Sequence, residues 1–279
     1  MAQENSEVRY HIRFTEWQRY LHAIVLSTFI GLALTGLPLR FSSAIWAKWF
    51  ARAIGGFAAI LFFHKFCALL LTAGFLIHLG GLAYRGLVKR DKGIFWGPNS
   101  MIPQPRDFKD LYDHLRWFLW LGPRPKFDRF AYWEKFDYWA VFWGMAIIGL
   151  SGYAMWFAPF FAKFITGSWL NAALVLHGEE ALLAVWFIFT IHFFNSHLRP
   201  GSFPMDLVIF TGKETEKELR EKHPQEYQRL LKEGRLKLTE VAPSREFKNF
   251  GRTVGWVIIL VGFVLLWLTL RSFFRGSST

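Results

Sequence analysis

Five long apolar stretches, separated by polar connections, constrain the fold of this 279-residue chain more than any other feature. A helix needs about 20 apolar residues to cross the hydrocarbon core of a bilayer, and each stretch is of that order. We predict membrane-spanning helices over residues 20–39, 54–84, 138–160, 170–197 and 253–270. Because a bilayer admits only helices or closed barrels, the expected fold class is an all-α integral membrane protein.

The positive residues lie in the connections and predict the orientation of the chain. Residues 85–135 hold eleven Lys and Arg and residues 199–252 hold twelve, whereas residues 41–53 hold two and residues 161–169 hold one. Basic loops stay on the cytoplasmic side, so we expect both long connections and the N-terminus there. Membrane topology thus accounts for the net charge of +12 without a nucleic-acid partner.

The expected domain organisation follows from the spans. Residues 1–198 are expected to form a four-helix bundle that includes a cytoplasmic loop at 85–135. Residues 199–252 form a second cytoplasmic loop with a charged helix, and residues 253–279 form the fifth transmembrane helix and a tail.

The two cytoplasmic loops carry helical patterns of their own. Residues 107–120 have an amphipathic pattern that predicts an interfacial helix, and residues 214–234 read as one solvated, charged helix. His11, His114 and His223 lie in polar segments, so we expect them at the surface.

Histidines inside the apolar spans are the strongest functional signal. His177 and His192 are fifteen residues apart, which is about 22 Å along a helix, and their rings are about 60° apart around its axis. Since the second and fourth spans run in the same direction, His64 and His177 are expected near the outer face. His78 and His192 are expected near the inner face, together with His22 from the start of the first span.

These two layers of imidazoles predict iron ligation. Polar groups within a membrane are costly and usually functional, and neutral imidazole is a ligand of haem iron. The chain has one cysteine, Cys67, and no Cys-x-x-Cys-His motif, so two non-covalently held b-type haems are expected. The outer layer supplies two ligands, whereas the inner layer offers three candidates for two positions. A hydrogen bond to a backbone carbonyl is the alternative role for any single histidine.

Other polar residues and glycines near the spans have two possible roles each. Arg19, Lys65, Arg40 and Arg85 could contact haem propionates or extend to the membrane interface. Six glycines could admit a porphyrin or a neighbouring helix: Gly31, Gly36, Gly74, Gly144, Gly149 and Gly152. The carboxylates Glu179 and Glu180 could carry protons, but their place at a helix start favours solvation.

The motif Arg19-Tyr20-Leu21-His22, followed by Leu32-Ala33-Leu34-Thr35-Gly36, resembles the cytochrome b (gamma) subunits of membrane-bound formate dehydrogenases and nickel–iron hydrogenases. This resemblance covers the membrane part of the chain and implies two haem b groups. It implies that His64 and His177 hold the outer iron, and that His22 and His192 hold the inner iron. Two departures, the fifteen-residue spacing in place of fourteen and the extra His78, leave His78 open as an alternative inner ligand.

The resemblance also implies partners and a location. The segment from Tyr132 to Trp139, together with Asn195-Ser196-His197-Leu198-Arg199-Pro200, is similar to a branch that partners periplasmic multihaem c-type cytochromes. A periplasmic multihaem cytochrome or iron–sulfur subunit is therefore the expected partner, in a bacterial inner membrane. The implied quinone, menaquinone or ubiquinone, would lie near the inner haem, with Asp128 and Arg13 as candidate contacts. For Asp128 the alternative is an ion pair with Arg129 or Lys126.

The expected function is that of a di-haem electron-transfer subunit of a quinone-linked membrane oxidoreductase. It would carry electrons between a quinone near the cytoplasmic side and the periplasmic partner. A stand-alone cytochrome b that oxidises quinol and reduces a small acceptor is one alternative. A non-redox membrane anchor or transporter, whose histidines bind protons or metal, is another.

Overall fold

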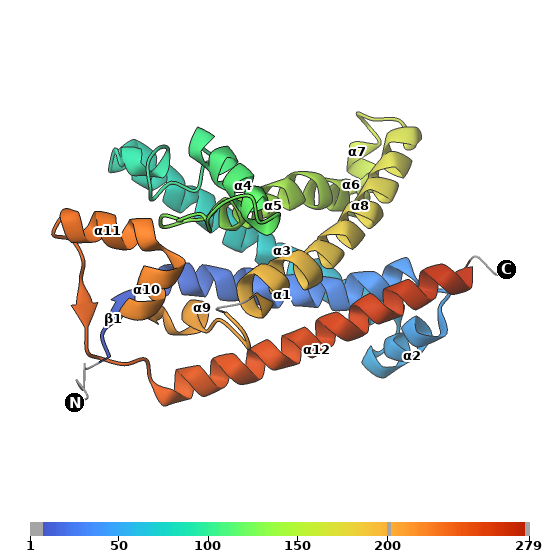
Figure 1. Ribbon diagram of the computed structural model, residues 1–279. Coiled ribbons are helices and arrows are strands. Elements are labelled where there is room, and N and C mark those ends of the chain that lie inside the picture. Colours follow the sequence, from blue (N-terminus) through green and yellow to red (C-terminus); the bar gives the residue numbers. More distant parts are fainter. Residues whose placement is uncertain (1–7, 200–201, 277–279) are drawn as a thin grey trace. The chain divides into compact units, whose positions relative to one another are not determined.

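A computed structural model describes residues 8–199 and 202–276, and these residues are predominantly helical (Figure 1). Five helices in this described part are long and apolar enough to cross a membrane. They are Glu16–Arg40, Phe57–Val88, Tyr132–Trp156, Gly167–Leu198 and Arg245–Phe274. The predicted all-α membrane fold with five spans is therefore confirmed, and each span overlaps the stretch expected from hydropathy.

Three of these spans contain π-helical turns. The second span is α3 (Phe57–Ala83) followed by a π-helical turn at Tyr84–Val88. The third is α5 (Tyr132–Gly144), a π-helical turn at Met145–Gly149 and α6 (Leu150–Trp156). The fourth is α8 (Gly167–Phe187), followed by π-helical turns at Ile188–His192 and Phe194–Leu198. Such turns hold one extra residue and are frequent at functional sites.

The chain divides into two compact units, and the first is a helical bundle unit. It consists of Leu21–His78, Ala140–Arg199 and Val254–Thr279. Besides the long helices it contains α2 (Ile45–Ile54) and α7 (Ala158–Phe161). Its buried core joins α1 (Glu16–Arg40), α8 with the π-helical residues after it, and α12 (Arg245–Gly276). The core residues are Ala33, Leu37, Leu182, Val185, Phe189, Phe193 and Leu265.

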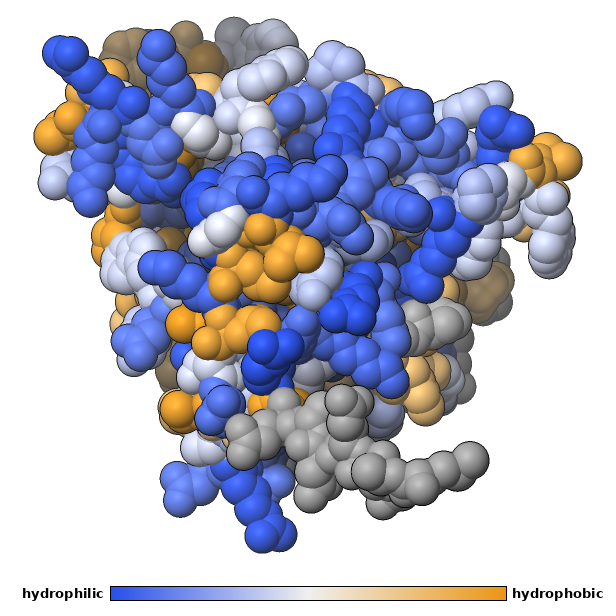
Figure 2. Space-filling model, turned by 60° about the vertical axis from the view of Figure 1, so that its left-hand side comes forward, coloured by the Kyte–Doolittle hydropathy of each residue, from blue (hydrophilic) through white to orange (hydrophobic). Residues whose placement is uncertain are grey.

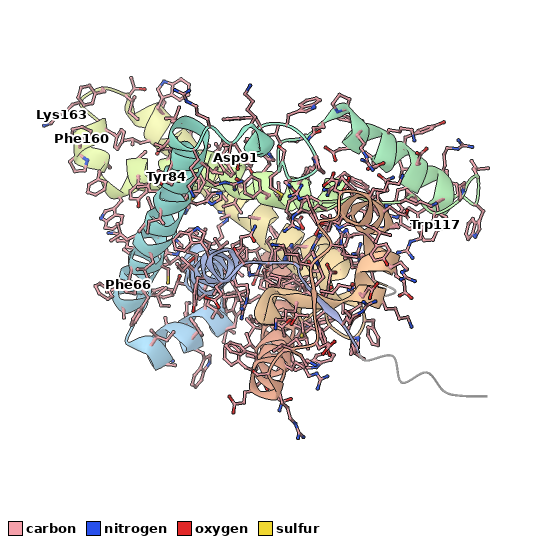
Figure 3. The ribbon with its side chains drawn as sticks, turned by 90° about the vertical axis from the view of Figure 1, so that its left-hand side faces the viewer. Phe66, Tyr84, Asp91, Trp117, Phe160 and Lys163 are labelled. Atoms are coloured by element: carbon pink, nitrogen blue, oxygen red, sulfur yellow. The ribbon has the colours of Figure 1, made fainter. Side chains whose placement is uncertain are left out.

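Apolar side chains also cover the exposed surface of α3. Phe62, Phe66 and Ile77 are each at least half exposed, and Figure 3 labels Phe66 on this helix. In water such a surface would be unfavourable, but in a bilayer lipid tails solvate it as readily as the protein core does. The exposed apolar residues of the bundle unit thus agree with the membrane-spanning fold.

The second unit, here called the loop unit, is built from Met1–Tyr20, Leu79–Trp139 and Pro200–Thr253. A small antiparallel sheet of order β2-β1-β3 joins segments that are far apart in the sequence. Strand β1 (Tyr10–Ile12) lies between β2 (Lys213–Thr215) and β3 (Leu238–Thr239). The sheet ties the segment before α1 to the second long connection.

Short helices complete the loop unit. They are α4 (Pro105–Phe118), α9 (Val208–Thr211), α10 (Glu216–Lys222), α11 (Pro224–Lys232) and a 3₁₀ turn at Lys92–Ile94. The amphipathic helix expected at 107–120 is present as α4, which exposes Phe108, Tyr112 and Leu115 along one side. Figure 2 brings the left-hand side of Figure 1 forward, and hydrophilic residues cover most of that face.

The single solvated helix expected at 214–234 is wrong. The structure has strand β2 followed by α10 and α11, which are separated at His223. Pro224 has no backbone N–H to continue α10, and it takes the first position of α11 instead. The segment is also not fully solvated, because Leu219 and Glu226 are almost completely buried.

Candidate functional site

The imidazole of His64 is held in a defined orientation inside the bundle unit. Its Nδ1 lies 3.0 Å from Oγ1 of Thr35 on α1. The Thr35 hydroxyl donates its own hydrogen to the carbonyl of Gly31 at 2.6 Å, so its oxygen is left to accept. His64 therefore donates from Nδ1–H to Thr35, and its Nε2 carries the free lone pair that a metal ion would bind.

His177 is oriented in the same way by the third span. Its Nδ1 lies 2.9 Å from the backbone carbonyl of Ile148, in the π-helical turn, and 3.4 Å from Oγ of Ser151. A carbonyl oxygen can only accept, so the hydrogen is on Nδ1 and the lone pair is on Nε2. Both histidines thus have the tautomer that metal-ligating imidazoles adopt, with the second nitrogen fixed by the protein.

The two rings lie close to each other, as expected of two ligands of one iron. The ring centroids of His64 and His177 are 6.2 Å apart, and the ring planes are inclined at 75°. A metal–nitrogen bond of about 2.0 Å and about 1 Å from each nitrogen to its ring centroid give a separation of about 6 Å. The centroid distance therefore fits one metal ion held between these two imidazoles.

Two glycines make room for these rings. A Cβ on Gly36 would lie 3.2 Å from Cε1 of His64, and a Cβ on Gly152 would lie 2.9 Å from Cε1 of His177. Any larger residue would displace the imidazole beside it. Both glycines are among the six that the sequence analysis singled out, and here each permits close approach of a histidine ring.

The inner-layer histidines also lie in the bundle unit. His192 and His197 are close enough to His22 for their charges to interact with it. His78 lies on α3 with its ring edge-on to Phe142, at a centroid distance of 6.2 Å. The structure thus brings the first and fourth spans together at the His22 level.

The π-helical turn at Ile188–His192 lies between His177 and His192 along the fourth span. A π-helical turn accommodates one residue more than an α-helical turn does. The fifteen-residue spacing exceeds by one the fourteen that the resemblance implies, and this turn is a physical means of absorbing the additional residue.

The cationic residues considered as propionate contacts have different surroundings. Arg19 lies one turn before His22 on α1 and donates from Nη2 to the carbonyl of Phe210, while its buried Nε has no hydrogen-bond partner among the described residues. Lys65 lies over the ring of Trp156, with Nζ 4.9 Å from the centroid.

The other two candidates have carboxylate partners. Arg85 forms an ion pair with Asp91 at 2.6 Å, and both side chains are at least one-third exposed. Arg40 forms an ion pair with Glu179, and both side chains are about half exposed. Of the four, Arg19 is the one whose buried donor has no acceptor within residues 8–199 and 202–276, so its environment best suits an additional anionic group.

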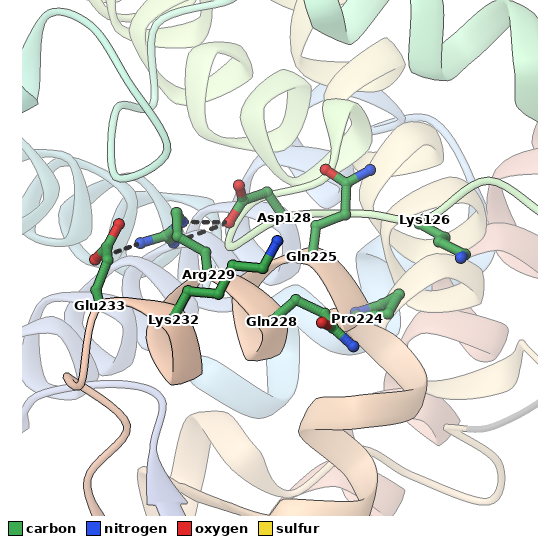
Figure 4. A pocket seen from close by; sticks show the side chains of 8 residues that line it. All are labelled: Lys126, Asp128, Pro224, Gln225, Gln228, Arg229, Lys232 and Glu233. Atoms are coloured by element: carbon green, nitrogen blue, oxygen red, sulfur yellow. Dashed lines mark hydrogen bonds and ion pairs between the residues drawn. The ribbon is translucent and has the colours of Figure 1, made fainter.

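The proposed quinone contacts lie in the loop unit, but each has protein partners. Asp128 accepts a hydrogen bond from Nη2 of Arg229 at 2.9 Å (Figure 4). It also lies 3.6 Å from Nη1 of Arg106. It lines an open groove of about 610 Å³ between the segment before α5 and helix α11. Arg13 is buried and donates from Nη1 to Glu226 at 2.7 Å. Asp128 therefore makes the ion pairs that the alternative reading anticipated, although with basic residues more distant in the sequence.

Two histidines of the loop unit are buried, contrary to the expectation from the sequence. His11 and His223 were expected at the surface, but their exposed fractions are 8% and 5%. Nδ1 of His223 lies 2.9 Å from the carbonyl of Asp128, and His114 stacks on Phe118 with centroids 4.5 Å apart. The polar neighbours along the chain suggested exposure, whereas contacts with distant segments bury His11 and His223.

Comparison with known proteins gives one consistent result. The chain is 23% identical over 222 residues to the "Formate dehydrogenase, cytochrome b556(fdo) subunit" of Escherichia coli (strain K12), covering 79% of this chain and 93% of that protein. The proteins of the same name from the O6:H1 and O157:H7 strains match with the same identity and coverage. No protein-family model matches the chain. The similarity extends over nearly the whole length of the relative.

Proposed function

We propose that the protein is a di-haem b-type cytochrome subunit that carries electrons across a membrane. The observation that carries this proposal is the pair His64 and His177, whose Nδ1 atoms are both held by protein acceptors at a ring separation of 6.2 Å. The similarity to a cytochrome b556 subunit supports the same assignment independently. Bound haem would supply reversible one-electron chemistry at this pair.

His22 and His192 are proposed to hold the second iron. A positive charge on His192 would act on His22, because the two imidazoles lie near each other in the bundle unit. His78 stays an alternative ligand, and its ring lies against Phe142. One iron at each layer would give two redox centres separated along the membrane normal, since His177 and His192 are fifteen residues apart on one span.

The proposed partners follow from the orientation and the relative. The relative is named as a subunit of formate dehydrogenase, so we propose that this chain likewise serves a multisubunit oxidoreductase. The positive-inside rule places the outer haem toward the periplasm, where a multihaem cytochrome or iron–sulfur subunit would exchange electrons with it. Quinone, menaquinone or ubiquinone, is proposed to react at the cytoplasmic side of the inner membrane, with Asp128 and Arg13 nearby.

A visible spectrum of the purified protein tests the haem assignment. We expect a reducible b-type spectrum and about two haems per chain. Replacing His64 or His177 by alanine should remove one haem and leave the other. The double variant should retain as much haem as either single variant. Absence of haem, or retention of both haems in these variants, would contradict the proposal.

The inner ligands are tested with a matched pair of variants. His22→Ala should remove one haem, whereas His78→Ala, at a similar expected depth, should retain both. The reverse outcome would assign the inner iron to His78.

Quinone linkage needs a separate measurement, because haem binding alone does not require it. In the protein reconstituted in liposomes, a soluble quinol should reduce the haems, and Asp128→Asn should slow that reduction without changing haem content. Unchanged reduction kinetics in this variant would remove Asp128 from the quinone site.

A further inference from the structure

The loop unit encloses a cluster of ionisable side chains whose charges do not balance. Arg13, with 3% of its side chain exposed, contacts Glu226 at 2.7 Å and Glu134 at 3.3 Å. Arg129 contacts the other oxygen of Glu226 at 2.8 Å. Two guanidinium groups are thus matched by two carboxylates. Glu214 adds a third carboxylate beside them, and only 2% of this residue is exposed.

Glu214 lacks a partner of its own in the described part of the chain. Its Oε1 atom is buried and makes no hydrogen bond to the described residues. On β2 it is directly opposite His11 of β1, and directly opposed residues of an antiparallel pair project from the same face of the sheet. His11 is also buried, and its Nε2 likewise makes no hydrogen bond within residues 8–199 and 202–276.

The charged groups around Glu214 come from each neighbouring segment. Arg13 directly follows β1, α11 contributes Glu226, α10 contributes Lys222, and the segment before α9 contributes Asp206. Strand β1 itself contributes His11, which is opposite Glu214. Lys222 is already bound to Asp206 at 2.8 Å. Arg13 is already bound to two carboxylates, so no cation in this set is available to Glu214 alone.

A buried charge without a partner is unfavourable, and protonation removes it. Burial raises the pKa of Glu214 to about 7, and the charge of Arg13 opposes this rise only partly. Burial lowers the pKa of His11, so its imidazole stays neutral near neutral pH. The neutral carboxyl group offers an O–H donor, and the His11 ring offers an acceptor nitrogen on the same face of the sheet.

We propose that Glu214, together with His11, forms a buried proton-binding site in the loop unit that takes up one proton from solvent as the pH falls through neutrality. Proton uptake neutralises the third carboxylate of the cluster, and proton release restores its unbalanced charge. The site controls how firmly β2 pairs with β1. This inference does not depend on the proposed electron-transfer function.

The direction of the pH effect follows from linkage between proton binding and opening of the sheet. The ordinary pKa of a glutamate is 4.5, and in the folded unit that of Glu214 is about 7. Protonation of Glu214 therefore stabilises the pairing of β1 with β2 fully below pH 4.5, and this stabilisation is lost as the pH rises through 7. With one proton involved, the equilibrium constant for opening should rise about tenfold between pH 6 and pH 8.

Hydrogen exchange of the full-length protein in detergent tests this directly. After correction for the intrinsic pH dependence of exchange, amides of β1 and β2 should lose about tenfold protection from pH 6 to pH 8. Glu214→Gln, which cannot ionise, should keep its protection at pH 8. Glu221→Gln is the matched control, because this carboxylate on α10 is 63% exposed. Equal pH dependence in wild type and Glu214→Gln would overturn the proposal.

A second measurement does not need the variant to fold. Infrared spectra of the wild-type protein should show a protonated carboxyl band at pH 6 that disappears with a midpoint near pH 7. Complete ionisation of all glutamates at pH 6 would overturn the proposal, whatever the behaviour of Glu214→Gln.

Discussion

Thr35→Val tests whether the protein orients His64 for metal binding. Valine has nearly the shape of threonine but cannot accept the hydrogen bond from Nδ1 of His64, which is 3.0 Å long. Thr35 is only 6% exposed, so no bulk water replaces the lost acceptor. The substitution removes this hydrogen bond and the one that the Thr35 hydroxyl donates to the Gly31 carbonyl, and it leaves the ligand itself in place.

The expected loss of haem affinity follows from the hydrogen bond between Thr35 and His64. A buried donor left without an acceptor costs about 1–3 kcal/mol. Loss of an outer-shell partner of a metal-ligating histidine typically weakens metal affinity by about 10–100-fold, which is about 1.4–2.8 kcal/mol. The two ranges agree, so we expect one of the two haems to be held about 10–100-fold more weakly, with the other unchanged.

Haem transfer to an excess of a haem-free globin, followed in the visible spectrum, measures this loss. Thr28→Val is the matched control, since Thr28 is also buried on α1 and its hydroxyl also donates to a backbone carbonyl, at 2.6 Å. If Thr35→Val and Thr28→Val release haem at the same rate, the hydrogen bond does not support the ligand and the assigned tautomer of His64 is wrong.

Three further substitutions probe other parts of the structure. Gly152→Ala places a Cβ 2.9 Å from the ring of His177, so the outer haem should be lost selectively. The reduced-minus-oxidised spectrum measures this loss, and a full haem content would contradict the packing of Gly152 against His177. Gly262→Ala creates an overlap with the ring of Phe189 and should lower the free energy of unfolding by about 1–3 kcal/mol. An unchanged melting temperature would show that α12 is not packed against the π-helical turn Ile188–His192 there. Glu226→Gln removes the negative charge that the guanidinium groups of Arg13 and Arg129 contact. It should destabilise the loop unit by about 3–5 kcal/mol, measured by denaturant titration. An unchanged free energy of unfolding would show that this ion pair does not stabilise the unit.

The sequence alone was sufficient to predict the five spans and the all-α membrane fold. The requirement for about 20 apolar residues per crossing is local, so hydropathy along the chain suffices to find the helices. The two layers of histidines are a prediction of the same local kind, because helical rise converts the spacing of His64, His78, His177 and His192 directly into an expected depth. These inferences need no knowledge of which helices are neighbours.

Only the tertiary structure decided which groups hold the histidine rings and which polar residues are buried. Thr35 and the carbonyl of Ile148 are acceptors supplied by other helices, and nothing in the local sequence of His64 or His177 identifies them. His11 and Glu214 are about two hundred positions apart and become neighbours only when β1 pairs with β2. A hydropathy pattern depends only on residues that follow one another in the chain. Hydrogen bonding and burial depend on segments that are far apart in the sequence and meet only on folding.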